Sequence, residues 1–383
     1  MKNKSISDAI IDFYKLQDSR PIPLHAPMFR PEDVTAVAKV VESGWVSSAG
    51  QEIFEFEDDI KHYVNADYCV ATVNGTSALH LALLAIGAGS DTEILLQPFT
   101  FVATANAISY CGAHPHFVDI ESESLGVDPK RLEIYLHQIA FVRNTTLVNI
   151  KTGRTIKALV IMHTFGLMSK VDELKELCNK YGISLIEDAA EALGSESSNV
   201  HAGTHGDIGV FSFNGNKIIT TGSGGAVVTN NEGYARKIRH LATTARLNHI
   251  WKIEHDELGF NYRMSNLNAA LGRSQIAMIR DKVELKRSLH QRIENHFSGI
   301  KGLDVLNEAH NSKSNYWLNA IRLSKDFSIK EIIEECIKEG IMVRPAWKLA
   351  SQLPHYLNCE QMDLLESTTQ SNRIICLPSS ENL

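Results

Sequence analysis

The alternation of helical and strand-like segments between about residues 50 and 230 is the feature that most constrains the fold. Small apolar residues at helical spacing over 76–87 are followed by short apolar runs typical of buried strands. An amphipathic helix predicted over 170–181 closes at Gly182 and leads into the apolar run ISLIED. This alternation is typical of a mostly parallel sheet with helices on both faces. The expected strands are 93–96, 116–118, 158–163, 183–188, 206–213 and 224–231.

The charge-rich stretch that follows predicts a change of architecture. Its helical period predicts a single long helix over about 266–297, which would connect two bodies. From about residue 315 the alternation of strand and helix resumes on a smaller scale. We therefore expect a large α/β domain over 1–275 and a smaller C-terminal α/β domain over 276–383, with the N-terminal helix packed on the smaller one.

Composition excludes several classes of partner. The 383 residues include 38 Lys and Arg against 45 Asp and Glu, a formal net charge of −7, so the broad positive field that attracts nucleic acid or anionic lipid is missing. No apolar stretch approaches the roughly 18–20 residues of a membrane span, and no secretory leader is expected. The six cysteines are widely spaced, which favours thiols over a disulfide framework. We expect a cytoplasmic protein with no nucleic-acid or membrane partner.

A single lysine stands in the most informative segment, GDIGVFSFNGNKIITTGSGG at 206–225. Lys217 follows a hydrophobic strand and precedes a glycine-rich turn. A lysine near apolar walls loses its proton more easily, which suits a nucleophile that forms a Schiff base. The alternative is an ordinary surface lysine in a loop.

Two further motifs carry candidate chemistry. Asp188 ends the run ISLIED, so it lies at the carboxyl end of a predicted strand, where ligands bind in open α/β sheets. A carboxylate there could pair with a protonated heterocyclic nitrogen, or it could simply cap a helix. Upstream, Gly75, Thr76 and Ser77 open a predicted helix in NGTSALHLAL. Backbone N–H groups and hydroxyls at such a helix start form an anion site suited to phosphate, although many helices begin in this way.

Together these motifs resemble fold-type I pyridoxal 5'-phosphate (PLP) enzymes and, more closely, the nucleotide-sugar aminotransferases of the DegT/StrS family. The resemblance covers about residues 20–380 and implies a fold-type I aminotransferase, an α/β fold with a large mostly parallel sheet domain and a smaller C-terminal α/β domain. The matching blocks, in the family's order, are NGTSALHLAL, QPFTFVATANAISYCGAHPHFVDI, MHTFGL, IEDAAEALGS, GDIGVFSFNGNKIITTGSGG and GFNYRMSNLNAALG.

The resemblance implies roles for individual residues. Lys217 would bond covalently to PLP, and Asp188 would keep the pyridine nitrogen protonated so that the ring acts as an electron sink. Phe101 would stack on the pyridine face, unless it is a core phenylalanine. The cofactor phosphate would be bound by Gly75, Thr76, Ser77 and Ser212.

The resemblance also implies roles for residues at the edges of the site. Asn261 would reach the phosphate of the neighbouring subunit's cofactor, with Arg263 as a second candidate beside it, which implies a homodimer with shared sites. His163 would lie near the site, unless it is a structural histidine. Glu191 stands where many family members have Gln or His, near the cofactor's phenolic oxygen. A carboxylate beside a phenolate is repulsive unless one of them is protonated. Ser223 replaces a common Glu, for which we have no account.

Lys217 also decides the chemistry that the resemblance implies, because a branch of the family with histidine there dehydrates or deoxygenates sugars. With lysine, the expected reaction moves an amino group from L-glutamate to C4 of a UDP-linked 4-keto-6-deoxy-N-acetylhexosamine, as in the bacillosamine and legionaminic acid routes. PLP would cycle through pyridoxamine 5'-phosphate, and the products would be a UDP-4-amino-4,6-dideoxy sugar and 2-oxoglutarate. The alternatives are a GDP-4-keto-6-deoxymannose aminotransferase of the perosamine synthase type, and a non-catalytic PLP-binding regulatory protein.

The C-terminal segment supplies candidate substrate residues. Arg344 suits a pyrophosphate, and Trp347 suits the face of a base or sugar, with Lys348 beside them. The alternative is that all three hold ordinary strand-end and core positions. No metal is expected.

Overall fold

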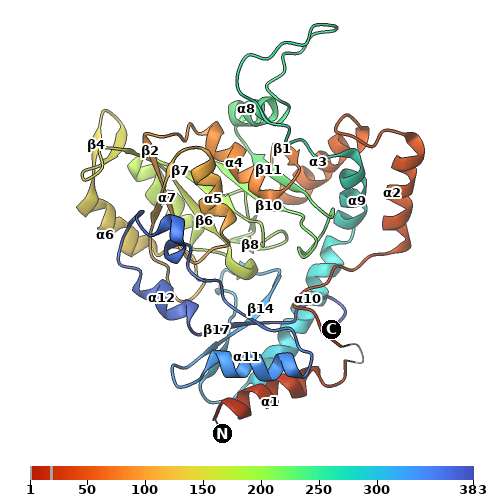
Figure 1. The fold of residues 1–383 in the computed structure, drawn as a ribbon, viewed down its shortest axis with the longest axis vertical. Helices are drawn as coiled ribbons and strands as arrows, with labels where there is room; N and C mark the ends of the chain where they lie inside the picture. Colours follow the sequence, from red (N-terminus) through yellow and green to blue (C-terminus); the bar gives the residue numbers. More distant parts are fainter. Residues whose placement is uncertain (1, 18–19) are drawn as a thin grey trace.

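The computed structural model describes residues 2–17 and 20–383, and it consists of a large helix-covered sheet above a smaller sheet (Figure 1). The large sheet has the strand order β1-β11-β10-β7-β6-β2-β3-β16. Neighbours from β10 to β16 are parallel, whereas β11 is antiparallel to both β1 and β10. The predicted mostly parallel sheet is therefore confirmed. The bounds are β1 (Tyr68–Thr72), β2 (Thr92–Leu96), β3 (His114–Phe117), β6 (Thr155–Met162), β7 (Ser184–Asp188), β10 (Ile208–Ser212), β11 (Gly225–Thr229) and β16 (Glu360–Gln361).

Helices cover both faces of this sheet, which explains why strands such as β2 and β11 are buried along their whole length. A separate hydrophobic cluster fills the space on each face. One face carries α4 (Gly75–Ala85), α5 (Ala103–Tyr110) and α8 (Glu232–Ala242). The other carries α3 (Gln51–Val64), α6 (Pro129–Ile139), α7 (Val171–Tyr181) and α9 (Asn266–Ile276), and α2 (Pro31–Ser43) packs on α9. A hairpin of β4 (Ala140–Arg143) and β5 (Thr146–Asn149) extends the sheet beside β6.

The predicted single helix over 266–297 is wrong. The structure has two helices there, α9 and α10 (Ile279–Phe297), separated by Ala277 and Met278. Helical period alone could not locate the break, because no glycine or proline marks it. The break lets α9 pack on α2 and α3 of the large body while α10 contacts the small sheet.

The small sheet is antiparallel and has the order β12-β14-β17-β15. The helix α1 (Lys2–Tyr14) packs on α11 and α10, with Ile6 and Ile10 inside the same hydrophobic cluster as Ile332. These elements are β12 (Leu303–Val305), β14 (Asn319–Leu323), β15 (Arg344–Pro345), β17 (Ile374–Leu377), α11 (Ile329–Lys338) and α12 (Leu365–Ser371), and short 3-10 turns occupy Thr164–Gly166, Ala350–Gln352 and Pro354–Tyr356.

Several segments cross between the two bodies. Besides α1, the strand β16 pairs with β3 in the large sheet although it lies late in the chain. A third sheet joins β13 (Ser312–Lys313) to β8 (Glu196–Ser197) and β9 (Val200–His201). The division of the chain at 275/276 stays a prediction. Within 2–17 and 20–383, every helix is too short or too polar to traverse a lipid bilayer.

Candidate active site

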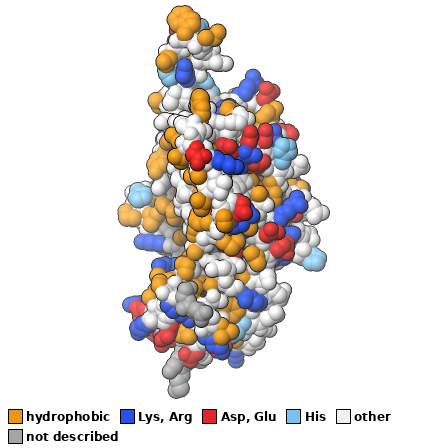
Figure 2. Space-filling model, turned by 90° about the vertical axis from the view of Figure 1, so that its right-hand side faces the viewer, with side chains coloured by type: hydrophobic (Ala, Val, Ile, Leu, Met, Phe, Trp, Pro, Cys, Tyr) orange, Lys and Arg blue, Asp and Glu red, His pale blue; other side chains and the backbone are white. Residues whose placement is uncertain are grey.

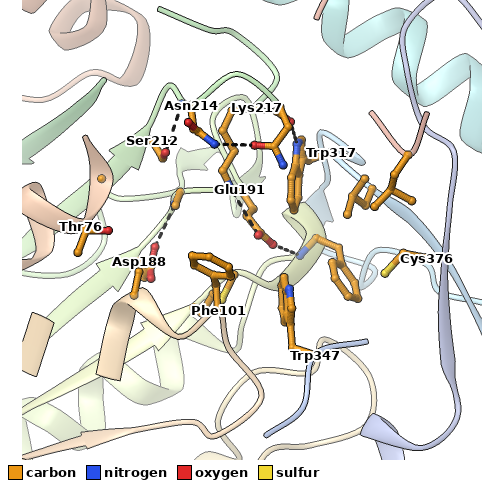
Figure 3. A pocket seen from close by; sticks show the side chains of 18 of the residues that line it. Thr76, Phe101, Asp188, Glu191, Ser212, Asn214, Lys217, Trp317, Trp347 and Cys376 are labelled. Atoms are coloured by element: carbon orange, nitrogen blue, oxygen red, sulfur yellow. Dashed lines mark hydrogen bonds and ion pairs between the residues drawn. The ribbon is translucent and has the colours of Figure 1, made fainter. Parts of the chain in front are cut away.

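A cavity of about 610 Å³ lies at the carboxyl ends of the parallel strands, between the large sheet and the C-terminal segment (Figure 3). Its size falls in the range of sites for small ligands and cofactors. The structure brings most of the predicted site residues to this cavity but leaves Ser77, His163, Asn261 and Lys348 out of its lining. The predicted residues that line it are Gly75, Thr76, Phe101, Asp188, Glu191, Ser212, Lys217, Arg344 and Trp347.

Asp188 is the last residue of β7, and its side chain is buried at the floor of the cavity. Oδ2 accepts a hydrogen bond from the hydroxyl of Thr104 (2.7 Å), and Oδ1 accepts one from the N–H of Ala190 (3.2 Å). Burial raises the pKa of Asp188, and these two bonds from neutral groups offset only part of that effect. The site therefore has a buried carboxylate that a cationic ring nitrogen would stabilise.

Lys217 enters the cavity from the loop after β10, where its backbone N–H donates to the carbonyl of Asn214. Its Nζ lies 3.3 Å from Oε1 of Glu191 and 4.0 Å from the centre of the Trp317 ring. The Trp317 indole is fixed because its Nε1–H donates to the carbonyl of Asn216 (2.7 Å). The amine is thus held between an acidic group and an aromatic face, as Figure 3 shows. Lys217 is therefore not an ordinary surface lysine, because its side chain is only 13% exposed and lines the cavity.

The start of α4 faces the same cavity. Gly75 and Thr76 open the helix, so their N–H groups precede the first intrahelical bonds and can bind an anion. A Cβ at Gly75 would lie only 3.0 Å from Cβ of Ser212, so glycine lets the helix start approach β10 closely. Ser77 lies outside the lining, and its N–H donates to the side chain of Asn74 (2.8 Å), which caps the helix.

Aromatic and basic groups form the outer wall. Phe101 follows β2 and leaves 54% of its surface exposed, so it is not a core phenylalanine. Its flat ring lies between Asp188 and Trp347 in the view of Figure 3. Trp347 packs 5.2 Å from the ring of Phe165, and Arg344 stands exposed in β15 at the cavity edge.

His163 takes the structural role that the sequence left open. It is fully buried, its Nδ1 accepts the N–H of Ser169 (3.1 Å), and its Nε2 bonds to Glu187 (2.9 Å). Both ring nitrogens are therefore used inside the protein. Lys348 is exposed one residue beyond the lining. The structure therefore does not place His163 or Lys348 where a substrate in the cavity would contact them.

Asn261 and Arg263 lie on a segment outside the cavity. Asn261 is exposed and forms an isolated bridge with Thr243. Arg263 stacks 4.8 Å over the ring of Phe54, and burial lowers its pKa. These two residues border residues 246–258, an arm that projects beside α8 (Figure 1). The lining of the cavity in the same chain therefore includes neither Asn261 nor Arg263.

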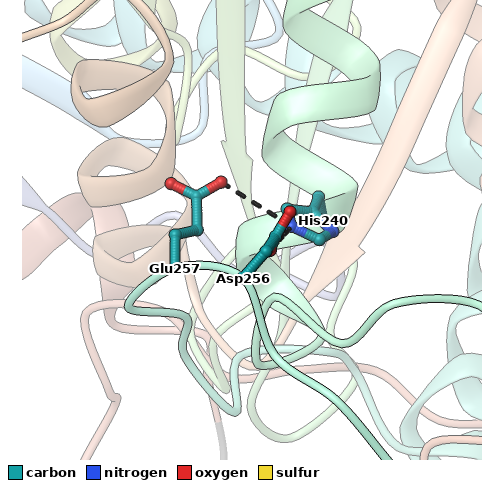
Figure 4. A group of neighbouring side chains, drawn as sticks. All are labelled: His240, Asp256 and Glu257. Atoms are coloured by element: carbon teal, nitrogen blue, oxygen red, sulfur yellow. Dashed lines mark hydrogen bonds and ion pairs between the residues drawn. The ribbon is translucent and has the colours of Figure 1, made fainter. Parts of the chain in front are cut away.

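An acidic cluster with one histidine ties the base of the arm to α8 (Figure 4). His240 and Asp256 approach to 2.6 Å, and Glu257 lies 3.6 Å from the same imidazole nitrogen. The three ligand atoms are close enough together for a metal ion. However, the ammonium of Lys237 bonds to both oxygens of Glu257 (2.7 and 2.6 Å) and already compensates its charge. The cluster is an ion-pair network that holds the arm.

The cavity fits PLP on chemical grounds. The helix start of α4 offers N–H donors for a phosphate, Asp188 offers an uncompensated carboxylate for a pyridinium nitrogen, and Lys217 offers an amine. Phe101 offers an exposed flat ring for stacking. Sequence reasoning missed Thr104 and Trp317, which support these groups from positions far away in the chain.

The fold and this cavity define a fold-type I aminotransferase. Residues 27–383 match the DegT/DnrJ/EryC1/StrS aminotransferase family, and the chain belongs to that family. The family implies PLP as the cofactor and a nucleotide-linked sugar as the substrate.

The names of relatives in this family refer to different nucleotide-linked sugars. The chain is 34% identical over 370 residues to the putative pyridoxal phosphate-dependent aminotransferase EpsN of Bacillus subtilis (strain 168), with 95% of this chain and 92% of that protein covered. It is 33% identical over 366 residues to the GDP-perosamine synthase of Vibrio cholerae, with 94% of each covered. It is 32% identical over 327 residues to a UDP-4-amino-4,6-dideoxy-N-acetyl-beta-L-altrosamine transaminase of Campylobacter jejuni subsp. jejuni serotype O:23/36 (strain 81-176), with 85% and 83% covered.

A solved structure supports the fold independently. The fold is similar to that of Helicobacter pylori PseC, an aminotransferase involved in the biosynthesis of pseudoaminic acid, with a TM-score of 0.85. Sequence identity is 26%, and 95% of each chain is covered. The predicted fold class is thereby confirmed over nearly the whole chain.

Proposed function

We propose that this protein transfers an amino group from L-glutamate to C4 of a UDP-linked 4-keto-6-deoxy-N-acetylhexosamine. The observation that carries the proposal is the convergence of Lys217, Asp188 and the start of α4 on one cavity. The Campylobacter relative, whose name refers to a UDP-linked 4-amino-4,6-dideoxy sugar, supports the choice of nucleotide. The Vibrio relative favours a second candidate, amination of GDP-4-keto-6-deoxymannose.

Each residue of the inner cavity has a distinct task in this reaction. When bound, PLP supplies the electron sink that makes the α-hydrogen of an amino acid acidic. Asp188 keeps a proton on the ring nitrogen by pairing with it. Nζ of Lys217 would take the proton from the α-carbon of the amino acid and would deliver it to the C4′ carbon of the cofactor, on the other side of the nitrogen that joins them. The N–H groups of Gly75 and Thr76, with the hydroxyl of Ser212, bind the phosphate.

The outer wall orients the sugar nucleotide. Arg344 presents a guanidinium that pairs with a pyrophosphate, and Trp347 offers an apolar face for a sugar or base. Both come from the C-terminal segment, whereas the inner cavity comes from the large sheet. Substrate choice and amine chemistry are therefore assigned to different parts of the chain.

The arm supports a homodimer with shared sites. It exposes Ile250 (99%), Trp251 (75%) and Leu258, and Figure 2 shows hydrophobic side chains gathered at this projecting end. Such side chains on a projecting segment are typical of a protein interface. A second copy of this chain is the partner we propose, because Asn261 stands at the base of the arm and outside its own cavity. Asn261 would then reach the phosphate site of the partner.

The substrate assignment is tested with a panel of UDP-, GDP- and dTDP-linked 4-keto sugars and L-glutamate. We expect turnover with the UDP-linked N-acetylhexosamine, and turnover confined to a GDP-sugar would overturn that assignment. The absorbance of the bound cofactor should change when L-glutamate is added. A spectrum that stays unchanged would favour a non-catalytic PLP-binding protein.

Lys217→Ala tests the chemistry. Loss of the amine should lower turnover at least about 10³-fold. The matched control is Lys330→Ala on α11, where the lysine is exposed and does not line the cavity. Turnover that survives the Lys217 change would refute the mechanism.

Shared sites are tested by mixing two variants. A dimer of Lys217→Ala with Asn261→Ala contains one cavity in which both residues are intact. Activity regained on mixing supports the shared site. Failure to regain activity, with dimers shown by ultracentrifugation, would contradict it.

A further inference from the structure

Glu191 is a buried acidic group of the cavity whose role the proposed mechanism leaves open. Its side chain is about 1% exposed, and Oε2 accepts the backbone N–H of Phe165 (2.9 Å). Oε1 faces Nζ of Lys217 at 3.3 Å. One carboxyl oxygen is therefore fixed by the backbone while the other points at the reactive amine, as Figure 3 shows.

The surroundings of Glu191 disfavour its charged form. Asp188 lies on the same segment and adds negative charge nearby, and Cys376 of β17 faces it from the small sheet. Arg344 also lines the cavity, and among the residues that the structure describes Lys217 is the cation in direct contact with Glu191. Burial raises the pKa of Glu191 to about 7, although Lys217 and the Phe165 N–H act in the opposite direction. Both forms of the carboxyl group are accessible near neutral pH.

We propose that Glu191 is the proton partner of Lys217, a role that rests on the proposed amine transfer. The proton leaves Nζ of the ammonium and joins Oε1 of the carboxylate, so that an N–H bond breaks, an O–H bond forms and both charges disappear. The reverse transfer restores the ion pair. No other reactant is required, because the two groups already lie within hydrogen-bonding distance.

This proton exchange meets two chemical requirements of the proposed reaction. Lys217 must be uncharged at Nζ before it can act as a nucleophile or accept a proton. A protonated Glu191 also lacks the charge that would repel a phenolate oxygen nearby. A glutamine at this position could hydrogen-bond but could not take up the proton. The Trp317 ring keeps the amine beside Glu191 during the exchange.

The test is infrared difference spectroscopy of the cofactor-free full-length protein between pH 5.5 and 9. Wild type should show a protonated carboxyl band that titrates near pH 7, and Glu191→Gln should lose it. Lys217→Ala should move the midpoint upward by about one pH unit or more, because removing a nearby cation disfavours the carboxylate. The control, Glu331→Gln on the exposed face of α11, should match wild type.

A second measurement follows the rate at which added PLP attaches covalently to Lys217. In wild type the rate should change slope near pH 7, and in Glu191→Gln that change should vanish. Identical profiles, or a carboxyl band that ignores the Lys217 change, would overturn the proposal. If Glu191→Gln does not fold, the Lys217→Ala spectra still decide. A failure of amine transfer to every sugar would refute the proposed function while leaving the infrared result standing.

Discussion

The buried acidic residue Glu93, at the amino end of the large sheet, and the two acidic residues of the cavity, at the carboxyl end, have pKa values shifted in opposite directions. At the amino end of β2, Glu93 accepts hydrogen bonds from His116 (2.8 Å) and Asn149 (2.8 Å) and pairs with Arg154 (3.3 Å). Burial alone would raise the pKa of Glu93. The bonds from His116, Thr152 and Asn149 outweigh burial and lower that pKa to about 2.

Burial prevails for the two acidic residues that line the cavity at the carboxyl end. Asp188 and Glu191 are both buried, and the pKa of each is raised although both accept hydrogen bonds. Removing a charge from water costs free energy at both places. Hydrogen bonds offset this cost at Glu93 but offset only part of it at Asp188 and Glu191. The difference indicates that the network around Glu93 contributes stability, whereas the cavity keeps acidic groups that a ligand stabilises.

The largest expected effect is at the carboxyl end. Asp188→Asn should lower turnover by about 10³-fold, equivalent to about 4 kcal/mol, because the amide cannot hold a proton on a ring nitrogen. The melting temperature should stay the same or rise, since an amide removes the cost of burying the charge. Steady-state kinetics and calorimetry on the same sample check both statements. A marked loss of stability would show that Asp188 stabilises the fold, contrary to this expectation.

At the amino end the balance should reverse. Glu93→Gln should lower the free energy of unfolding by about 3 kcal/mol, in line with the lowered pKa of Glu93. Turnover should change by less than about twofold, because the site is remote from the cavity. Urea unfolding measures the loss, with Glu133→Gln as a surface control whose exposed ion pair with Lys180 is expected to move the midpoint little. A variant with normal stability and impaired turnover would contradict the assignment.

Acid should reveal the same network in the wild type. The folded-state pKa of Glu93, about 2, lies below its usual 4.5. Its contribution to stability is therefore fully present above about pH 5 and is lost as pH falls towards 2. Between these values the free energy of unfolding should fall more steeply in wild type than in Glu93→Gln. Parallel curves from urea titrations at several pH values would show that Glu93 is not the group responsible.

The smallest effect concerns the exposed wall of the cavity. Arg344→Ala should raise the KM for the nucleotide sugar by about 10-fold, or about 1.4 kcal/mol, with unfolding unchanged. Lys348→Ala is the matched control, because Lys348 is also exposed in this segment but does not line the cavity. Equal effects of the two substitutions would show that general positive charge, and not a specific contact, attracts the substrate.

Local patterns explain which parts of the fold were predictable. The helix before β7 ends at Gly182 because that residue adopts φ 66°, and the run ISLIED continues into the strand that Asp188 closes. Residues adjacent in sequence carry all of this information. The start of α4 was predicted in the same way, but its rotation was not. A turn of roughly 100° per residue decides that Thr76 and not Ser77 faces the cavity.

Contacts between distant segments explain what sequence reasoning missed. Thr104 bonds to Asp188 across 84 positions, and Trp317 meets Lys217 from the other body of the protein. Neither contact leaves a periodic pattern near the residue that it supports. The structural role of His163 was likewise undecided until Ser169 and Glu187 were seen to occupy both ring nitrogens. The proposed pairing of Glu191 with Lys217 also depends on tertiary geometry.

The segments that cross between the two bodies have a mechanical consequence. Because α1 packs on α11 and β16 pairs with β3, the polypeptide passes from one half to the other at both its beginning and its end. A protease cut at Ala277 or Met278, between α9 and α10, would leave two fragments interlocked by these elements. Severing the backbone there would not release Arg344 from the neighbourhood of Lys217, and the nicked enzyme should remain competent.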